Sequence, residues 1–152
     1  MKKYSILISI LLFFATAKAQ ISETIYLSAA GTLKDYAFTH PTATVTNLTI
    51  SGNIDARDVR FMRDSMHALK DLDIDNTSIV AYTGTGGTRT MFNYYPANEM
   101  PEFSFYSYPI RDKSDTIITT IIFPQNLNAI GSFTFYECSG LTGEYPPTRL
   151  PW

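Results

Sequence analysis

Short stretches of alternating apolar and polar residues recur through the middle of the chain. In each, an apolar residue is followed by apolar residues three and five positions later and by Asn or Thr eight positions later, starting from Val45, Leu69 and Ile118. Because successive side chains of a strand point to opposite faces, each stretch predicts a short strand with one apolar face. The structural repeat positions predicted within them are Leu48, Ile50, Asn53, Leu72, Ile74, Ile121, Phe123 and Asn126.

The spacing of these stretches indicates a repeat. The step from Val45 to Leu69 is matched by the step from Ile118 to a further start at Leu141, and the step between Leu69 and Ile118 is close to twice as long. The single steps lie within the range of about 20–29 residues that is typical of leucine-rich repeats. One unit cannot bury its apolar face alone, so the units are expected to stack into a parallel sheet. The alternative is an unrelated α+β domain in which apolar triplets recur by chance.

The double step between Leu69 and Ile118 contains the polar, glycine-containing segment AYTGTGGTRTMFNYYPANEM, residues 81–100. Gly and polar residues favour a loop over a regular element. We interpret the segment as a loop inserted at the edge of the repeat array, where it displaces the strand of one unit.

A helix is expected between the first two strands. Val59, Met62, Met66 and Leu69 follow one another at steps of three, four and three, which is the spacing of one helical face. Asp55 is placed as its N-cap, with Asp58 in the capping-box position at the third place after it. The first unit is therefore predicted as strand, helix, strand, whereas the aromatic and Gly/Ser-rich later units favour tight turns or short helical segments.

A second internal match joins two aromatic segments near the C-terminus. The segment MPEFSFYSY, from Met100, has its aromatic residues at the same offsets as IGSFTFYEC, from Ile130. The aligned positions are Phe103 with Phe133, Phe105 with Phe135, and Tyr106 with Tyr136. We expect the four phenylalanines to fill the core. Cys138, the sole cysteine, aligns with Tyr108, which favours a packing position over a nucleophile.

The segment ITTIIFPQNLNAIGSFTFYECSGLTG, residues 118–143, closely resembles the repeat of BspA-like leucine-rich repeat proteins, which are secreted or surface proteins of gut and oral anaerobic bacteria. Its matching residues are Pro124, Ile130, Gly131, Phe135, Cys138, Ser139, Leu141 and Thr142, while Thr134 stands where the family prefers Ala. The resemblance implies an α/β solenoid with short parallel strands, export, and a role in adhesion or binding. It implies no active site.

The N-terminus has the layout of a secretory signal peptide. Lys2 and Lys3 precede an apolar run, and Ala17 and Ala19 supply a small-residue cleavage site. The predicted organisation is a signal peptide at 1–19, an N-terminal cap segment at 20–44, a strand-helix-strand unit with its inserted loop at 45–99, BspA-like repeats at 100–143, and an irregular or truncated C-terminus at 144–152. After cleavage no transmembrane span is expected.

The net charge and the candidate chemical groups limit the classes of function that fit the chain. The formal net charge is −2, and the predicted signal peptide carries three of the lysines. The rest of the chain is therefore more acidic and lacks the positive charge that binds nucleic acid. Asp71, Asp73 and Asp75 resemble a calcium loop, but Asn76 and Tyr82 stand where an EF-hand needs Gly and Glu. We therefore expect a solvated strand face, and we expect neither cofactor, nor metal, nor catalysis.

The candidate ligand contacts lie on that face and in the inserted loop. They are Asn47, Thr49, Asp71, Asp73, Asp75, Thr120 and Ile122 on the strands, and Tyr94 and Tyr95 in the loop. The leading hypothesis is a non-catalytic exported module that binds an extracellular protein or glycan. The alternatives are a purely structural N-terminal cap of a longer repeat protein and, more remotely, a glycan-active hydrolase.

Overall fold

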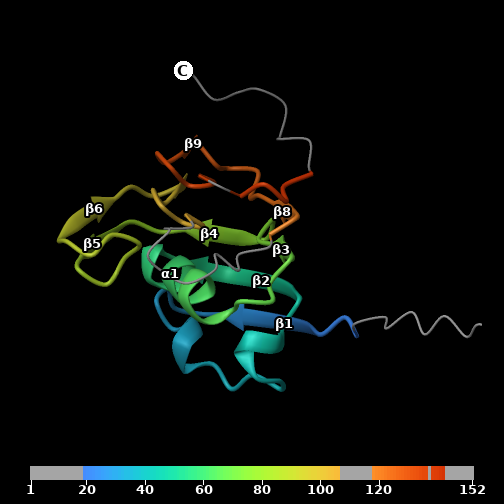
Figure 1. Ribbon diagram of the computed structural model, residues 1–152. Coiled ribbons are helices and arrows are strands. Elements are labelled where there is room, and N and C mark those ends of the chain that lie inside the picture. Colours follow the sequence, from blue (N-terminus) through green and yellow to red (C-terminus); the bar gives the residue numbers. More distant parts are fainter. Residues whose placement is uncertain (1–18, 107–117, 137, 143–152) are drawn as a thin grey trace, which may run out of the picture.

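The computed structural model describes residues 19–106, 118–136 and 138–142 (Figure 1). Residues 1–18 of the predicted signal peptide and the C-terminal segment 144–152 therefore lie outside the described residues, as does Tyr108. Within them the chain forms an α/β protein with a parallel sheet of short strands and one α-helix. The elements are β1 (Ser22–Leu27), 3-10 helices η1 (Leu33–Asp35) and η2 (Thr42–Thr44), β2 (Asn47–Ile54), α1 (Ala56–Ser65), β3 (Asp71–Asp73), β4 (Thr77–Ile79), β5 (Tyr82–Gly84), β6 (Asn93–Tyr95), β7 (Glu99–Met100), β8 (Thr120–Ile122) and β9 (Ala129–Ile130).

The main row of strands runs in the order β1-β2-β3-β8, and every pair is parallel. Leu48, Leu72 and Ile121 lie in register across three strands, so the three predicted strands are confirmed as parallel neighbours. β8 pairs directly with β3, although their partners Asp71 and Thr120 are separated in sequence by the whole double step. Among the described residues between β3 and β8, no strand enters this row.

β1 is a strand that the sequence pattern did not predict, because it lies in the segment assigned as a cap. It extends the main row by one period, since Ser22 pairs with Asn47 and Ile25 with Ile50. Glu23 occupies the inward position that is apolar in the other strands, and it is 7% exposed. His40 donates to Glu23 Oε1 through its backbone N–H, and the His40 Nδ1 atom lies 2.9 Å from the same oxygen. These hydrogen bonds lower the pKa of Glu23 below its ordinary value.

A second row of pairings lies beside the first. β4 pairs with the C-terminal half of β2, and β7 pairs with β9 in parallel. Asn98 joins the two pairs, because its N–H donates to the Ile79 carbonyl at 2.8 Å and its carbonyl accepts from the Asn128 N–H at 2.7 Å. Between the rows, Thr77 Oγ1 donates to the Ile74 carbonyl at 2.8 Å and closes the turn from β3 to β4. Thr77, which stands where the sequence pattern has Asn in other stretches, therefore stabilises this turn through its hydroxyl group.

The two Asn positions of the repeat behave differently from this threonine. Asn53 remains within β2, and its Nδ2 donates to the Ser28 carbonyl at 3.0 Å, beyond the end of β1. Asn126 lies in the turn before β9 and donates to the side chain of Asn98 at 3.1 Å, not to backbone. Asn126 therefore bonds a side chain, whereas Thr77 and Asn53 bond backbone carbonyls.

The predicted helix is confirmed, including its capping box. Asp55 accepts from the Arg57 N–H at 2.8 Å, and Asp58 accepts from the Asp55 N–H at 2.9 Å. Val59 and Met62 are fully buried and cover the inner face of the sheet. The helix ends at Ser65, just before Met66, yet Leu69 is still fully buried beyond its end.

The inserted segment is more ordered than a polar loop. β5 and β6 form an antiparallel hairpin, which projects from the sheet in Figure 1, and β7 follows it. The rings of Tyr82 and Tyr95 stack across the hairpin at 6.0 Å. The prediction of a plain loop was wrong because these cross-strand aromatic residues stabilise strands despite the flanking glycines.

The second internal match is confirmed as a structural repeat. Met100 pairs with Ile130, and the rings of Phe103 and Phe133 stack at 5.2 Å. Both phenylalanines have positive φ, 55° and 57°, a backbone conformation that bulky residues seldom adopt. Ser104 Oγ donates to the Pro101 carbonyl, and Thr134 Oγ1 donates to the equivalent Gly131 carbonyl at 2.6 Å. The same turn is therefore built twice.

The prediction that all four phenylalanines fill the core is confirmed for Phe105 and Phe135, whereas Phe103 is partly buried outside the main core and Phe133 is exposed. Phe105 is fully buried and stacks on the half-buried Phe135 at 6.1 Å. Phe133 is 55% exposed, because it stacks on the outside of Phe103 at the end of the described rings.

The carboxylate of Asp58 joins the helix to the loop after β1. Asp58 Oδ2 accepts from the N–H groups of Gly31 and Asp55 at 2.6 and 2.9 Å, and Oδ1 accepts from Leu33 at 2.9 Å. The side chain is fully buried, and this burial raises the pKa of the Asp58 carboxyl against the opposite effect of its three donors. One side chain thus satisfies three buried backbone donors.

The variant Asp58→Asn is expected to lower the free energy of unfolding by about 2–3 kcal/mol, because an amide nitrogen replaces one accepting oxygen and leaves a buried N–H unpaired. Urea denaturation of Asp58→Asn and of the exposed control Asp35→Asn measures this difference. Equal stability of the two variants would contradict it.

Candidate functional site

The outward side of the main row carries two columns of residues. Asn47, Asp71 and Thr120 lie in register, and so do Thr49, Asp73 and Ile122. Their alternate neighbours Leu48 and Leu72 point inward and are 1% exposed. Six of the candidate ligand contacts predicted from the sequence therefore lie together on one face of the sheet.

Hydrogen bonds order the first column. Asn47 Nδ2 donates to Asp71 Oδ2 at 2.9 Å, and Thr119 Oγ1 donates to Asp71 Oδ1 at 3.1 Å. Thr46 Oγ1 donates to Asn47 Oδ1 at 2.8 Å. Side chains held in this way lose little further conformational entropy on binding, which suits a recognition surface.

The second column is less polar toward its end. Asp73 Oδ1 accepts from the Asp75 N–H at 3.1 Å, whereas Ile122 is 50% exposed. Asp75 does not share the strand face with Asp71 and Asp73, because β3 ends at Asp73 and Asp75 lies in the turn before β4. The expectation of three alternating carboxylates on one strand is therefore wrong. The described residues contain no group of three or more His, Cys, Asp and Glu residues arranged to hold a metal ion.

The two tyrosines of the insertion differ in exposure. Tyr94 is 60% exposed and available to a partner, whereas Tyr95 is 3% exposed. The Tyr95 hydroxyl accepts from the Arg89 N–H at 2.8 Å, and its ring stacks on Tyr82. Tyr95 is therefore a core residue of the hairpin, and its assignment as a contact residue was wrong because strand alternation turns it inward.

Cys138 lies against the aromatic turn. Its side chain is partly buried, and Sγ donates to the Phe105 carbonyl at 3.2 Å. Burial raises the pKa of the Cys138 thiol, which lowers its thiolate fraction at neutral pH. Cys138 and Leu141 both pack against the main core as partly buried residues.

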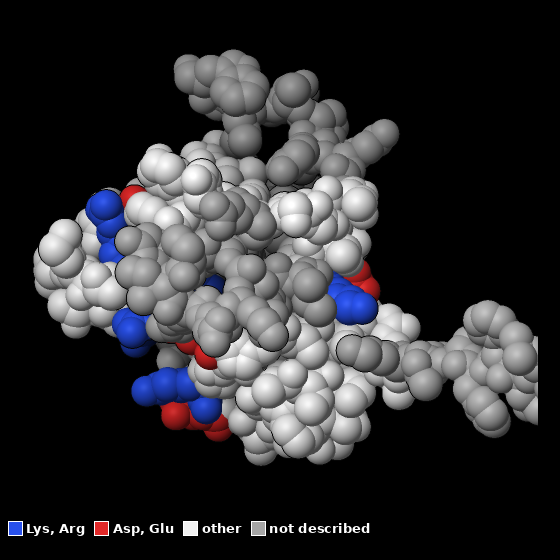
Figure 2. Space-filling model, in the orientation of Figure 1, with Lys and Arg blue, Asp and Glu red and all other residues white. Residues whose placement is uncertain are grey.

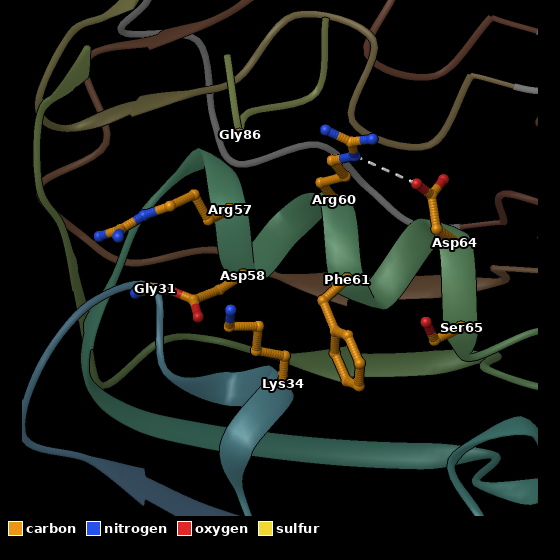
Figure 3. A pocket seen from close by; sticks show the side chains of 9 residues that line it. All are labelled: Gly31, Lys34, Arg57, Asp58, Arg60, Phe61, Asp64, Ser65 and Gly86. Carbon is orange, nitrogen blue, oxygen red and sulfur yellow. Dashed lines mark hydrogen bonds and ion pairs between the residues drawn. The ribbon is translucent and has the colours of Figure 1, made fainter. Parts of the chain in front are cut away.

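A pocket on the helix side was not predicted from the sequence. It has a volume of about 330 Å³ and lies between α1, the η1 segment and the loop at Gly86 (Figure 3). Its lining residues are Gly31, Lys34, Arg57, Asp58, Arg60, Phe61, Asp64, Ser65 and Gly86. The spacing of the polar residues on α1 indicates an exposed helical face, but the other walls come from segments well before and well after the helix, which local patterns do not bring together.

The charges on the described surface are mixed. On the face shown in Figure 2, Lys and Arg side chains lie beside Asp and Glu side chains, and uncharged residues cover most of the rest. Such a distribution favours short-range contacts over long-range steering of a highly charged partner.

The fold and these surfaces define the chain as an α/β protein with a parallel sheet of short strands and one helix among its described residues. No model of a known protein family matches the chain, and no curated protein matches it. In the part of the chain that the structure describes, no helix has the length and apolar character needed to cross a membrane. The surfaces of the described residues are therefore the basis for assigning a function.

Tyr94→Ala is expected to change the free energy of unfolding by less than about 0.5 kcal/mol, because its ring is exposed. Tyr95→Ala is expected to cost about 3 kcal/mol, because it empties the ring's place in the hairpin and removes an acceptor. Thermal and urea denaturation of this neighbouring pair measure the difference. A Tyr95→Ala protein as stable as Tyr94→Ala would refute the assignment of Tyr95 to the core.

Proposed function

We propose that the chain is an exported, non-catalytic leucine-rich repeat module that binds an extracellular protein or glycan through the outward face of its main strand row. The observation that carries this proposal is the pair of continuous columns on β2, β3 and β8, which present polar and apolar side chains in a fixed register. Ordered surfaces on rigid elements suit recognition.

The repeat assignment within this proposal is supported by the strand offsets. Ser22 of β1 pairs with Asn47 of β2, which in turn pairs with Asp71 of β3, so the two successive offsets are nearly equal. Both lie within the range of about 20–29 residues of leucine-rich repeats. Regular offsets of this size accompany stacked units that each contribute one strand. The doubled aromatic turn adds support for a repeat of the BspA-like kind.

Binding through the sheet face is tested with the double variant Thr49→Arg and Ile122→Arg. Both residues flank Asp73 in the second column, so two long cations there are expected to weaken binding at least about tenfold to any partner recovered by a glycan array or a host-protein pull-down with residues 20–152. Surface plasmon resonance measures the change.

Thr83→Arg, at an exposed position of the hairpin, is the matched control and is expected to bind as the unaltered protein does. Circular dichroism of all variants verifies that they are folded. Unchanged affinity of the folded double variant would exclude the sheet face as the binding site.

A second candidate function is a structural cap for further repeat units, and the unequal ends of the sheet favour it. Residues 28–46 lie beyond β1 in Figure 1, and their buried residues Leu33 and Val45 belong to the main core. At the opposite end Phe133 and Tyr136 are 55% and 49% exposed. One end is thus closed by its own segment, while the other presents stacking rings to a following unit.

The cap function is tested by appending one or two further copies of residues 118–143 after Gly143. If the end accepts another unit, each copy is expected to raise both the melting temperature and the urea m-value, because it buries Phe133 and adds a cooperative layer. Appended copies that stay unfolded, with an unchanged melting temperature, would rule out this role.

A further inference from the structure

We propose that the pocket beside α1 binds a small sugar acid, with Lys34 holding the carboxylate and Phe61 lying against the sugar ring. The site lies on the helix side, apart from the sheet face, and it does not rest on the function proposed above. Its volume of about 330 Å³ is at the lower end of ligand pockets, which suits one or two sugar units.

Two cations at the pocket are available to an anionic ligand. Lys34 lies on η1 and forms no ion pair with any described residue. Arg60 Nε is 3.3 Å from Asp64, and its Nη1 reaches the Thr85 and Gly87 carbonyls only at 3.4 and 3.5 Å. These contacts are at the outer limit of hydrogen bonding, so a ligand oxygen on that side of the pocket at normal distance would replace them at little cost.

The carboxylates near the pocket are already engaged. Both oxygens of Asp58 accept backbone N–H groups, and Asp55 is paired with Arg57 at 2.6 Å. Asp64 is shared by Arg60 and Arg63, the second at 2.9 Å. Among the described residues at and beside the pocket, the four cations Lys34, Arg57, Arg60 and Arg63 exceed the three carboxylates Asp55, Asp58 and Asp64 by one, which favours an anionic ligand.

The apolar part of the pocket favours a ring over a bare anion. Phe61 lines it and is half-buried, with its ring braced by Phe38 at 6.2 Å. In Figure 3 the Phe61 ring and the Lys34 side chain lie on the same side of α1, whereas Arg60 extends on the opposite side, toward Gly86. Ser65 lies further along the helix. An aromatic side chain beside a cation and a hydroxyl matches a ligand with an apolar ring face, a carboxylate and hydroxyl groups. A hexuronate has all three.

Isothermal titration of the folded protein with glucuronate tests the proposal, with glucose and acetate as comparison ligands. Glucuronate is expected to bind at least about fivefold more tightly than either, because glucose lacks the carboxylate and acetate lacks the ring. Equal binding of acetate would show a site for simple anions, and equal binding of glucose would show that the charge is irrelevant; either result overturns the proposal, as does the absence of binding.

Lys34→Gln is expected to weaken glucuronate binding about fivefold, whereas Lys70→Gln, which removes the same charge from an exposed residue outside the pocket, is expected to leave it unchanged. The Thr49→Arg and Ile122→Arg protein is expected to bind glucuronate normally, so failure of the sheet-face proposal and failure of this one are distinguishable. Equal loss in the Lys34→Gln and Lys70→Gln proteins would show non-specific attraction and overturn the site.

Discussion

The fully buried carboxylate of Asp58 is the constraint on which the N-terminal half depends. Its two oxygens accept three backbone N–H groups, from the helix N-cap and from the loop that follows β1. Asp55, the other buried carboxylate at this helix start, accepts from Arg57, whose guanidinium also donates to the Ala30 carbonyl at 3.0 Å and lies over the Tyr82 ring. The helix start, the loop after β1 and the inserted hairpin are therefore fixed relative to one another, and the pocket walls follow from this arrangement.

The helix, the strand columns and the doubled aromatic turn could be predicted from sequence because each depends on local spacing. Val59 and Met62 mark one helical face, and Asp55 and Asp58 need only their own backbone neighbours to form the capping box. The columns follow once the repeat spacing is known, because strand alternation decides which residues face outward. The doubled turn is visible as matched aromatic residues, and the same unusual φ at Phe103 and Phe133 shows that the match extends to the backbone.

The features that were missed depend on partners distant in sequence or on the end of an element. β1 was not predicted because Glu23 interrupts the apolar pattern of the strand. The buried Glu23 carboxylate is bonded by His40, which lies well downstream in the sequence. Tyr95 turned from a contact candidate into a core residue because the insertion forms a hairpin. Phe133 matches the sequence pattern of a core residue, but its ring lies at the end of the described stack of aromatic rings and is exposed. The pocket combines residues from three separate segments, so no single stretch of the sequence predicts it.

The two ends of the insertion meet in space, since the Asn98 N–H donates to the Ile79 carbonyl at 2.8 Å. A segment that leaves and rejoins a framework at adjacent points can change in length with only a small, logarithmic cost in loop closure. Residues 80–97 can therefore be lengthened, shortened or exchanged during evolution without shifting the register of the strands. The framework and the hairpin are free to diverge at different rates, with the exposed Tyr94 in the part that can vary most.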